Sequence, residues 1–119
     1  MRTLALLLVF LVALSHAGFL VLEMFYWNHP IGYRLFGTTP EFAASTAVLA
    51  ANQGLYNGFL AAGLVWSYFA TSGAFEIRVF FLACVVIAGL YGAATAAKTI
   101  LFAQALPGAA ALAVTLLAR

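Results

Sequence analysis

The sequence predicts an all-α integral membrane protein, a four-helix transmembrane bundle with antiparallel up-down topology. Hydrophobic residues make up 66% of the chain and charged residues 7%, whereas an ordinary soluble domain carries about 25% charged residues. The mean hydropathy is +1.11. The 119 residues admit four spans of the roughly 20 residues that a bilayer core requires, with short connections. We therefore expect one integral membrane domain over residues 1–119.

The first predicted span covers residues 3–27. Its start resembles a signal peptide, because apolar residues 4–14 precede Ser15-His16-Ala17, whose small residues are typical of a cleavage site. The apolar character continues to Trp27, and cleavage would leave residues 18–27, which are too few to span a bilayer. We therefore expect the segment to be retained as a helix that Asn28-His29-Pro30 ends.

The second predicted span covers residues 43–68 and follows a loop over residues 28–38. That loop mixes Arg34 with aromatic and aliphatic residues, so we expect it to lie along the membrane interface. Thr39-Pro40-Glu41 predicts the helix start, because threonine caps, proline suits the first turn and glutamate meets the positive end of the helix dipole. Thr71-Ser72-Gly73 predicts the next turn.

The third and fourth predicted spans cover residues 77–96 and 99–118. We place a turn near Lys98, because a fourth helix that began at Pro107 would be far too short to span. Pro107 then lies inside the fourth helix, where it should introduce a kink and free the carbonyl of Ala103.

Small residues recur at the spacing of helix-packing motifs. Gly54 and Gly58 form a G-x-x-x-G pair that Ala62 extends, and Ala88, Gly92 and Ala96 repeat the spacing. Such residues let two helix backbones approach closely. We expect them to pack the bundle internally, and a homodimer interface is the alternative.

Polar residues are expected to converge inside the bundle. Counting from each helix midpoint puts Glu23 in the same half of the bilayer as the amides that follow Ala51, with His16 and Asn57 near mid-depth. An ionisable group facing lipid is costly, so inward convergence is the favourable arrangement. The predicted cavity is lined by Glu23, Asn52, Gln53, Asn57, His16, Tyr56, Tyr91 and Gln104.

Two interpretations of these polar groups remain open. In the first they form interhelical hydrogen bonds, worth about 0.6 kcal/mol each, that hold the bundle together. In the second they form a binding site, because an ionisable residue within a membrane is by default a functional candidate. One carboxyl, one imidazole and several amides exceed what four short helices need.

The sequence argues against metal binding, thiol chemistry, nucleic-acid binding and acyl transfer. His16 and Glu23 lie roughly 10 Å apart along a helix axis and have no cysteine or second histidine nearby, so we expect no metal site. Cys84 is the single cysteine and lies in an apolar run, so we expect no intramolecular disulfide and no thiol redox pair. We also expect no cofactor. The charges are scattered, which argues against nucleic-acid binding. No arrangement of serine, histidine and carboxylate suggests acyl transfer.

The distribution of positive charge predicts the orientation in the cell inner membrane. Arg2, Arg78 and Arg119 lie on one side of the predicted bundle, and Arg34 and Lys98 lie on the other. Positive residues favour the cytoplasmic side. Both termini are therefore expected to be cytoplasmic, which turns the predicted cavity toward the exterior.

Several segments resemble one known family. VLEMFYW at residues 21–27, TPEF at 39–42, LAANQGLYNGFLAAGL at 49–64, YGAAT at 91–95 and QALP at 104–107 are similar to the small bacterial membrane proteins called domain of unknown function 1304. The resemblance covers nearly the whole chain. It implies four membrane helices and supplies no activity, substrate or catalytic residue.

Three functions are therefore compatible with the sequence. The first is a protein that binds or transports a small molecule through the polar cavity, with transport requiring a dimer. The second is a membrane enzyme or redox partner for a lipid-soluble substrate such as a quinone, with Phe19, Tyr56 and Tyr91 stacking on it and His16 or Glu23 moving a proton. The third is a structural or assembly subunit. We favour the first and do not expect an enzyme.

Overall fold

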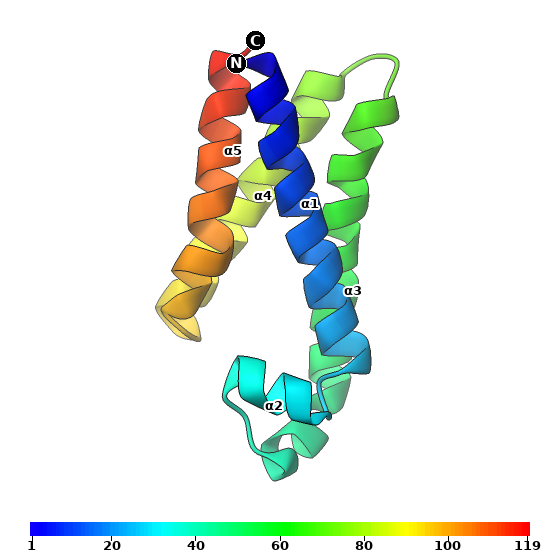
Figure 1. The fold of residues 1–119 in the computed structure, drawn as a ribbon, viewed down its shortest axis with the longest axis vertical. Helices are drawn as coiled ribbons and strands as arrows, with labels where there is room; N and C mark the ends of the chain where they lie inside the picture. The colour runs from blue at the N-terminus through cyan, green and yellow to red at the C-terminus, as the bar shows by residue number, and fades with distance from the viewer. The chain divides into compact units, whose positions relative to one another are not determined.

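The computed structural model describes all 119 residues and is entirely helical apart from its connections (Figure 1). The all-α class is thus confirmed. Two compact units divide the chain, one formed by Met1–Leu14 with Leu60–Arg119 and the other by Ser15–Phe59. The elements are α1 (Arg2–Phe25), α2 (Pro30–Phe36), α3 (Pro40–Phe69), α4 (Ala74–Thr95), the π-helical turn η1 (Leu101–Ala105) and α5 (Leu106–Leu117).

Two of the helices have the length and apolar composition that a membrane span requires. They are α1 and α4, with mean hydropathies of 2.5 and 2.1 over their most apolar windows. The apolar run Leu101–Leu117, which joins η1 and α5, is shorter than a typical span. The helix α3 is longer, with 30 residues, but it contains the three amides Asn52, Gln53 and Asn57.

The prediction of a loop over residues 28–38 was wrong, because this segment contains the short helix α2. Its ends carry clear local signals. The His29 Nδ1 atom accepts from the backbone N–H of Ile31 at 3.2 Å, and Pro30 occupies the first turn. Gly37 ends the helix in the left-handed conformation, with φ of 65°. Proline at the start and glycine at the end therefore define a two-turn helix.

The predicted start of α3 and the turn before α4 are confirmed. The backbone N–H of Phe42 donates to Thr39 Oγ1 at 3.2 Å, which is the expected capping bond. Gly73 precedes α4 with a positive φ of 70°. The next connection lies at residues 96–98, where the turn near Lys98 was predicted.

Pro107 lies within a continuous helical run, as predicted, but the backbone adapts through η1. In this π-helical turn the N–H of Leu106 bonds to the carbonyl of Leu101, five residues back. A proline has no N–H and its ring clashes with the preceding turn, so the wider turn immediately before Pro107 accommodates both effects.

The unit formed by Met1–Leu14 and Leu60–Arg119 packs four helical segments around an apolar core. Its members come from the first half of α1, the end of α3, α4 and α5, and Figure 1 shows α5 running beside α4. Gly108 faces Val85 and Gly89 faces Ala105, so α4 and α5 are antiparallel. The core residues are Val9, Val12, Ala13, Leu64, Leu82, Val85 and Ala111.

The Ser15–Phe59 unit contains the end of α1, α2 and most of α3. The helices α1 and α3 run antiparallel within it, since Met24 packs on Gly54 and Leu20 packs on Gly58. A Cβ atom on Gly54 would lie 2.9 Å from Met24 Cγ and 3.2 Å from the Leu20 carbonyl oxygen. The close helix contact predicted from G-x-x-x-G is therefore confirmed within one chain.

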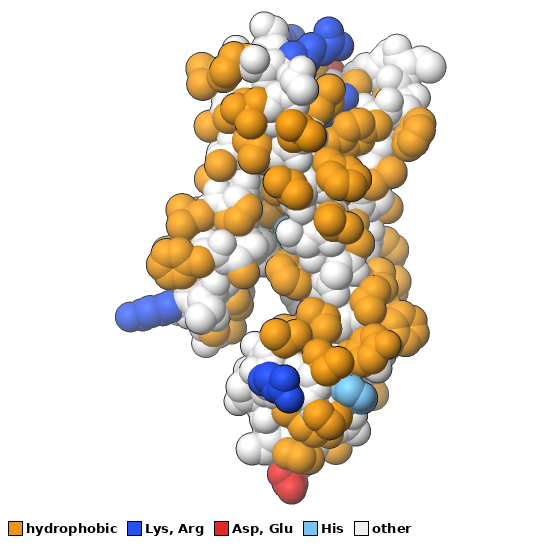
Figure 2. Space-filling view, in the orientation of Figure 1, with side chains coloured by type: hydrophobic (Ala, Val, Ile, Leu, Met, Phe, Trp, Pro, Cys, Tyr) orange, Lys and Arg blue, Asp and Glu red, His pale blue; other side chains and the backbone are white.

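The outward faces of the helices are apolar. Large hydrophobic side chains are widely exposed, among them Leu49 at 70%, Phe69 at 78% and Ile87 at 66%. Figure 2 shows hydrophobic side chains spread over the visible face, with few charged ones among them. The charged residues lie within five residues of a helix end or outside the helices: Arg2, Glu23, Arg34, Glu41, Glu76, Arg78, Lys98 and Arg119.

Candidate functional site

The candidate site lies in the Ser15–Phe59 unit and is built on one hydrogen bond between α1 and α3. Asn57 Nδ2 donates to Glu23 Oε1 at 2.6 Å, across 34 residues of sequence. Asn57 is buried, with 7% of its surface exposed, and Glu23 is half-buried. The glycines Gly54 and Gly58 allow the two helices to come close enough for this bond.

The position of Glu23 in its helix explains why it needs the hydrogen-bond donor that Asn57 supplies. Glu23 lies in the last turn of α1, where the free carbonyl groups carry partial negative charge and a carboxylate is disfavoured. No lysine or arginine pairs with it, because the one ion pair between charged side chains joins Arg119 and Glu76. The Asn57 amide therefore supplies the hydrogen bond that the Glu23 carboxyl group accepts from another side chain.

The second oxygen of Glu23 remains available as an acceptor. Asn57 contacts Oε1 only. The Glu23 side chain is half-buried, so its second oxygen is not enclosed by the fold. A carboxyl group with one oxygen fixed and the other accessible can accept a hydrogen bond from an amine, amide or hydroxyl of a ligand.

His16 is the most deeply buried of the predicted site residues, with 1% of its surface exposed. It lies two turns before Glu23 on α1, and its ring packs edge-on against Phe19 with the ring centroids 5.3 Å apart. From the sequence, Phe19 was one of the aromatic residues expected to stack on a planar substrate if the protein is an enzyme. In the structure Phe19 instead contacts the imidazole.

The other amides of α3 do not join the pair. The side chains of Asn52 and Gln53 are exposed, and neither is hydrogen-bonded to Glu23. Tyr56 is 60% exposed, and its ring packs against Phe59 with centroids 5.9 Å apart. These three residues therefore lie on the open side of α3, within two turns of Asn57.

Tyr91 and Gln104 belong to the other unit. Tyr91, on α4, is 72% exposed, and its backbone carbonyl accepts a hydrogen bond from Thr95 Oγ1 at 2.7 Å. Gln104 lies in η1 and is half-buried. A common cavity that joins them to Glu23 stays a prediction.

A second polar contact in the same unit was not expected from the sequence. Trp27 Nε1 donates to Thr46 Oγ1 at 3.1 Å, and the Trp27 ring packs against Phe36 with centroids 4.9 Å apart. Thr46 and Asn57 are eleven residues apart, which puts them on one face of α3. That spacing was the available signal, but from the sequence Trp27 was considered only as the end of the first apolar run.

Comparison with known proteins identifies relatives without assigned activity. Residues 10–116 match the family described as "Protein of unknown function (DUF1304)". A protein of Lactococcus lactis subsp. lactis (strain IL1403), described as "Uncharacterized protein YpaA", is 34% identical over 106 residues, covering 87% of this chain and 89% of the relative. No solved structure matches the chain.

Proposed function

The chain belongs to the family described as protein of unknown function (DUF1304), and from this premise we propose that it is a membrane protein that binds a small polar molecule at the Glu23–Asn57 pair. In this proposal the protein lies in the cell inner membrane and crosses it four times. Both of its termini are in the cytoplasm. The ligand is a small molecule with a hydrogen-bond donor.

Three features support the membrane location. The helices α1 and α4 have the length and hydropathy of spans. Exposed apolar side chains such as Phe69 and Ile87 would be unfavourable in water over so large a surface. The charged residues lie near helix ends, where they would reach the headgroup region.

The single observation that carries the binding site is the half-satisfied carboxyl of Glu23. Asn57 orients one oxygen, and the other is left for a ligand. A carboxyl used only to hold two helices together would be expected to have both oxygens occupied, because an unsatisfied polar group in an apolar environment is costly. The exposed amides Asn52 and Gln53 add donors and acceptors nearby on α3.

Glu23→Gln tests the binding site. Glutamine keeps an oxygen that accepts from Asn57 Nδ2, so the fold should persist while the charge is lost. Purified protein in a neutral detergent would be screened against amines, amides and polyols by thermal stability. We expect compounds that raise the Tm of the unchanged protein to lose that effect in Glu23→Gln, while the exposed control Glu41→Gln retains it.

The screen can reject the proposal. Stabilisation by the same compounds in Glu23→Gln as in the unchanged protein would show that the carboxyl is not part of a ligand site. The hypothesis that the protein transports a small molecule would then be rejected too, because the transported molecule would have to bind in the same cavity.

Labelling of introduced cysteines tests the topology. In a Cys84→Ala background, Leu35→Cys in α2 and Ser72→Cys before α4 place single thiols at exposed positions on opposite sides of the proposed membrane. A membrane-impermeant maleimide added to intact cells should label only the Leu35→Cys protein. Labelling of the Ser72→Cys protein instead would reverse the orientation, and labelling of both would contradict the spanning arrangement.

A second candidate function is a redox or enzymatic role with a lipid-soluble substrate. The group that would move the proton is the His16 imidazole beside the Phe19 ring, and because His16 is buried, a planar molecule such as a quinone would have to displace the side chains that cover it. Gently extracted protein should then carry a quinone that absorbs in the ultraviolet. Protein free of such a chromophore that also lacks quinone-dependent activity in membranes would contradict this role.

A further inference from the structure

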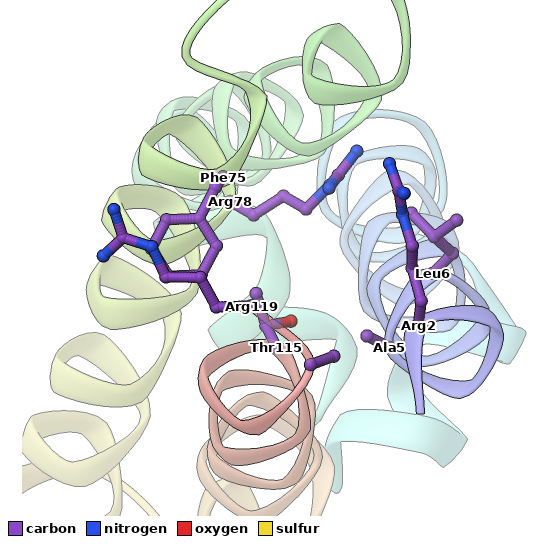
Figure 3. A pocket seen from close by; sticks show the side chains of 8 residues that line it. Arg2, Ala5, Leu6, Phe75, Arg78, Thr115 and Arg119 are labelled. Atoms are coloured by element: carbon purple, nitrogen blue, oxygen red, sulfur yellow. The ribbon is translucent and has the colours of Figure 1, made fainter.

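A hollow with three arginines opens between α1, α4 and α5 in the unit formed by Met1–Leu14 and Leu60–Arg119. Its volume is about 230 Å³, and the side chains around it include Arg2, Leu6, Phe75, Arg78, Thr115 and Arg119 (Figure 3). Three of the five cationic residues of the chain therefore line one hollow. The hollow shares no residue with the Glu23 site.

Arg78 is held in place by the end of α3. Its Nε donates to Ser67 Oγ at 3.1 Å, and its Nη2 donates to the Ser67 carbonyl oxygen at 2.9 Å. Ser67 is buried, with 1% of its surface exposed. A guanidinium has five N–H groups, so these two bonds leave three for another acceptor. The anchored side chain is thus oriented in advance to bind an anion.

The charge around the hollow is only partly compensated. Arg119 Nη2 lies 3.8 Å from Glu76 Oε1, and both side chains are well exposed. The Arg119 guanidinium also stacks on Phe75, with Cζ 4.5 Å from the ring centroid. Neither Arg2 nor Arg78 forms an ion pair. Because Glu76 pairs only with Arg119, the guanidinium groups of Arg2 and Arg78 have no paired carboxylate within the protein.

Thr115 provides a second, independent indication of a ligand. Only 4% of the Thr115 surface is exposed, and its Oγ1 atom is buried without a hydrogen-bond partner. A helical threonine commonly satisfies its hydroxyl on the carbonyl one turn earlier. Figure 3 shows Thr115 on the wall of the hollow that α5 forms, so a rotation about its Cα–Cβ bond would turn the hydroxyl toward a bound anion.

A separate apolar groove in the same unit is linked to the arginine hollow through Tyr68. It has a volume of about 370 Å³ and is lined by Phe10, Val65, Tyr68 and Phe69. Tyr68 connects the two sites, because its hydroxyl donates to the Leu6 carbonyl oxygen and the Arg78 guanidinium lies 5.6 Å from its ring centroid. A ligand that reaches from the hollow into the groove must combine an anionic head with an apolar tail.

We propose that this hollow binds the phosphate group of an anionic phospholipid whose acyl chain lies in the groove of Phe10, Val65, Tyr68 and Phe69. The Arg2 and Arg78 guanidinium groups pair with the phosphate oxygens, and Thr115 Oγ1 donates to the same group. The apolar groove on the other side of Tyr68 favours a lipid over a free phosphate ion. The proposal shares the membrane location with the proposed function, but it does not depend on the Glu23 site.

The test measures lipid retention by the full chain. Protein in a neutral detergent would be titrated separately with dioleoyl phosphatidylglycerol, dioleoyl phosphatidylcholine and inorganic phosphate, with bound lipid read by native mass spectrometry and Tm recorded in parallel. We expect preferential binding of phosphatidylglycerol. Arg2→Gln and Thr115→Val should each weaken it about tenfold, as expected when one hydrogen bond to a charged group is lost.

The control variants separate a specific site from general charge attraction. Lys98→Gln and Arg34→Gln each remove one positive charge outside the hollow and should leave phosphatidylglycerol binding unchanged. Glu23→Gln should also leave it unchanged, so failure of this proposal and failure of the Glu23 site are distinguishable. Thr115→Val should raise the Tm of the lipid-free protein, because the buried hydroxyl without a partner is removed.

Three results would overturn the proposal. Equal retention of phosphatidylcholine and phosphatidylglycerol would remove the role of the arginines. Stabilisation by inorganic phosphate as large as that by phosphatidylglycerol would show a phosphate site with no lipid selectivity. Unchanged phosphatidylglycerol binding in both Arg2→Gln and Thr115→Val would show that the lipid binds elsewhere.

Discussion

Gly89 of α4 lies against the backbone of Ala105 in η1. A Cβ atom on Gly89 would fall 2.6 Å from the Ala105 nitrogen and 2.8 Å from its Cα. Backbone atoms cannot move aside as a flexible side chain can, so this glycine is required for the contact between the two elements. The helical glycine Gly18 is the opposite case, because no atom lies within 4 Å of the corresponding position.

Gly89→Ala should therefore destabilise the protein by about 1–3 kcal/mol through overpacking. Gly18→Ala should stabilise it by up to about 1 kcal/mol, because alanine loses less backbone entropy in a helix. Denaturant titration in detergent, followed by circular dichroism, measures both changes. Equal effects of the two substitutions would contradict the close contact of α4 with η1.

The bond between Asn57 and Glu23 should contribute measurably to stability. Asn57→Leu removes the donor and leaves the half-buried carboxyl without a protein partner, so we expect a loss of about 1.5–3 kcal/mol. A double-mutant cycle with Glu23→Leu isolates the pair, with an expected coupling of about 0.5–3 kcal/mol. Additive effects of the two substitutions would mean that the bond is not formed in solution.

Thr46→Val should change the environment of Trp27. The substitution keeps the shape of the side chain but removes the acceptor of the indole N–H, at a cost of about 1 kcal/mol. In a Trp66→Phe background only Trp27 fluoresces, and we expect its emission to shift. Ser45→Ala is the matched control, because Ser45 bonds only to the Phe42 carbonyl oxygen. An equal shift in both proteins would argue against the Trp27–Thr46 bond.

The end of α2 should tolerate asparagine better than valine. Gly37 has a φ of 65° and open space around it, so the conformation, and not crowding, limits substitution. Gly37→Asn should cost little, because asparagine adopts left-handed angles more readily than other residues, whereas β-branched valine should cost roughly 1–2 kcal/mol. Unfolding free energies of the two variants test this order, and a more stable valine variant would contradict the observed turn.

Helix boundaries were predictable from the sequence because their signals are local. Thr39-Pro40-Glu41 marked the start of α3, Thr71-Ser72-Gly73 marked the turn before α4, and the connection near Lys98 was placed correctly. The error at residues 28–38 has a local origin too. The aromatic and charged residues of this segment were given more weight than Pro30 and Gly37, which delimit α2.

The sequence by itself determined that the chain is all-α and apolar, and that Gly54 and Gly58 let two helices approach closely, because composition and spacing along one helix suffice for such conclusions. Only the tertiary structure decided which polar groups meet. Two examples are the bond between Glu23 and Asn57 and the bond between Arg78 and Ser67, the latter at the hollow that Thr115 also lines. Each depends on how far one helix is rotated and shifted against its neighbour. Rotation and shift follow from many small packing contacts between residues distant in sequence, and no single helix contains that information.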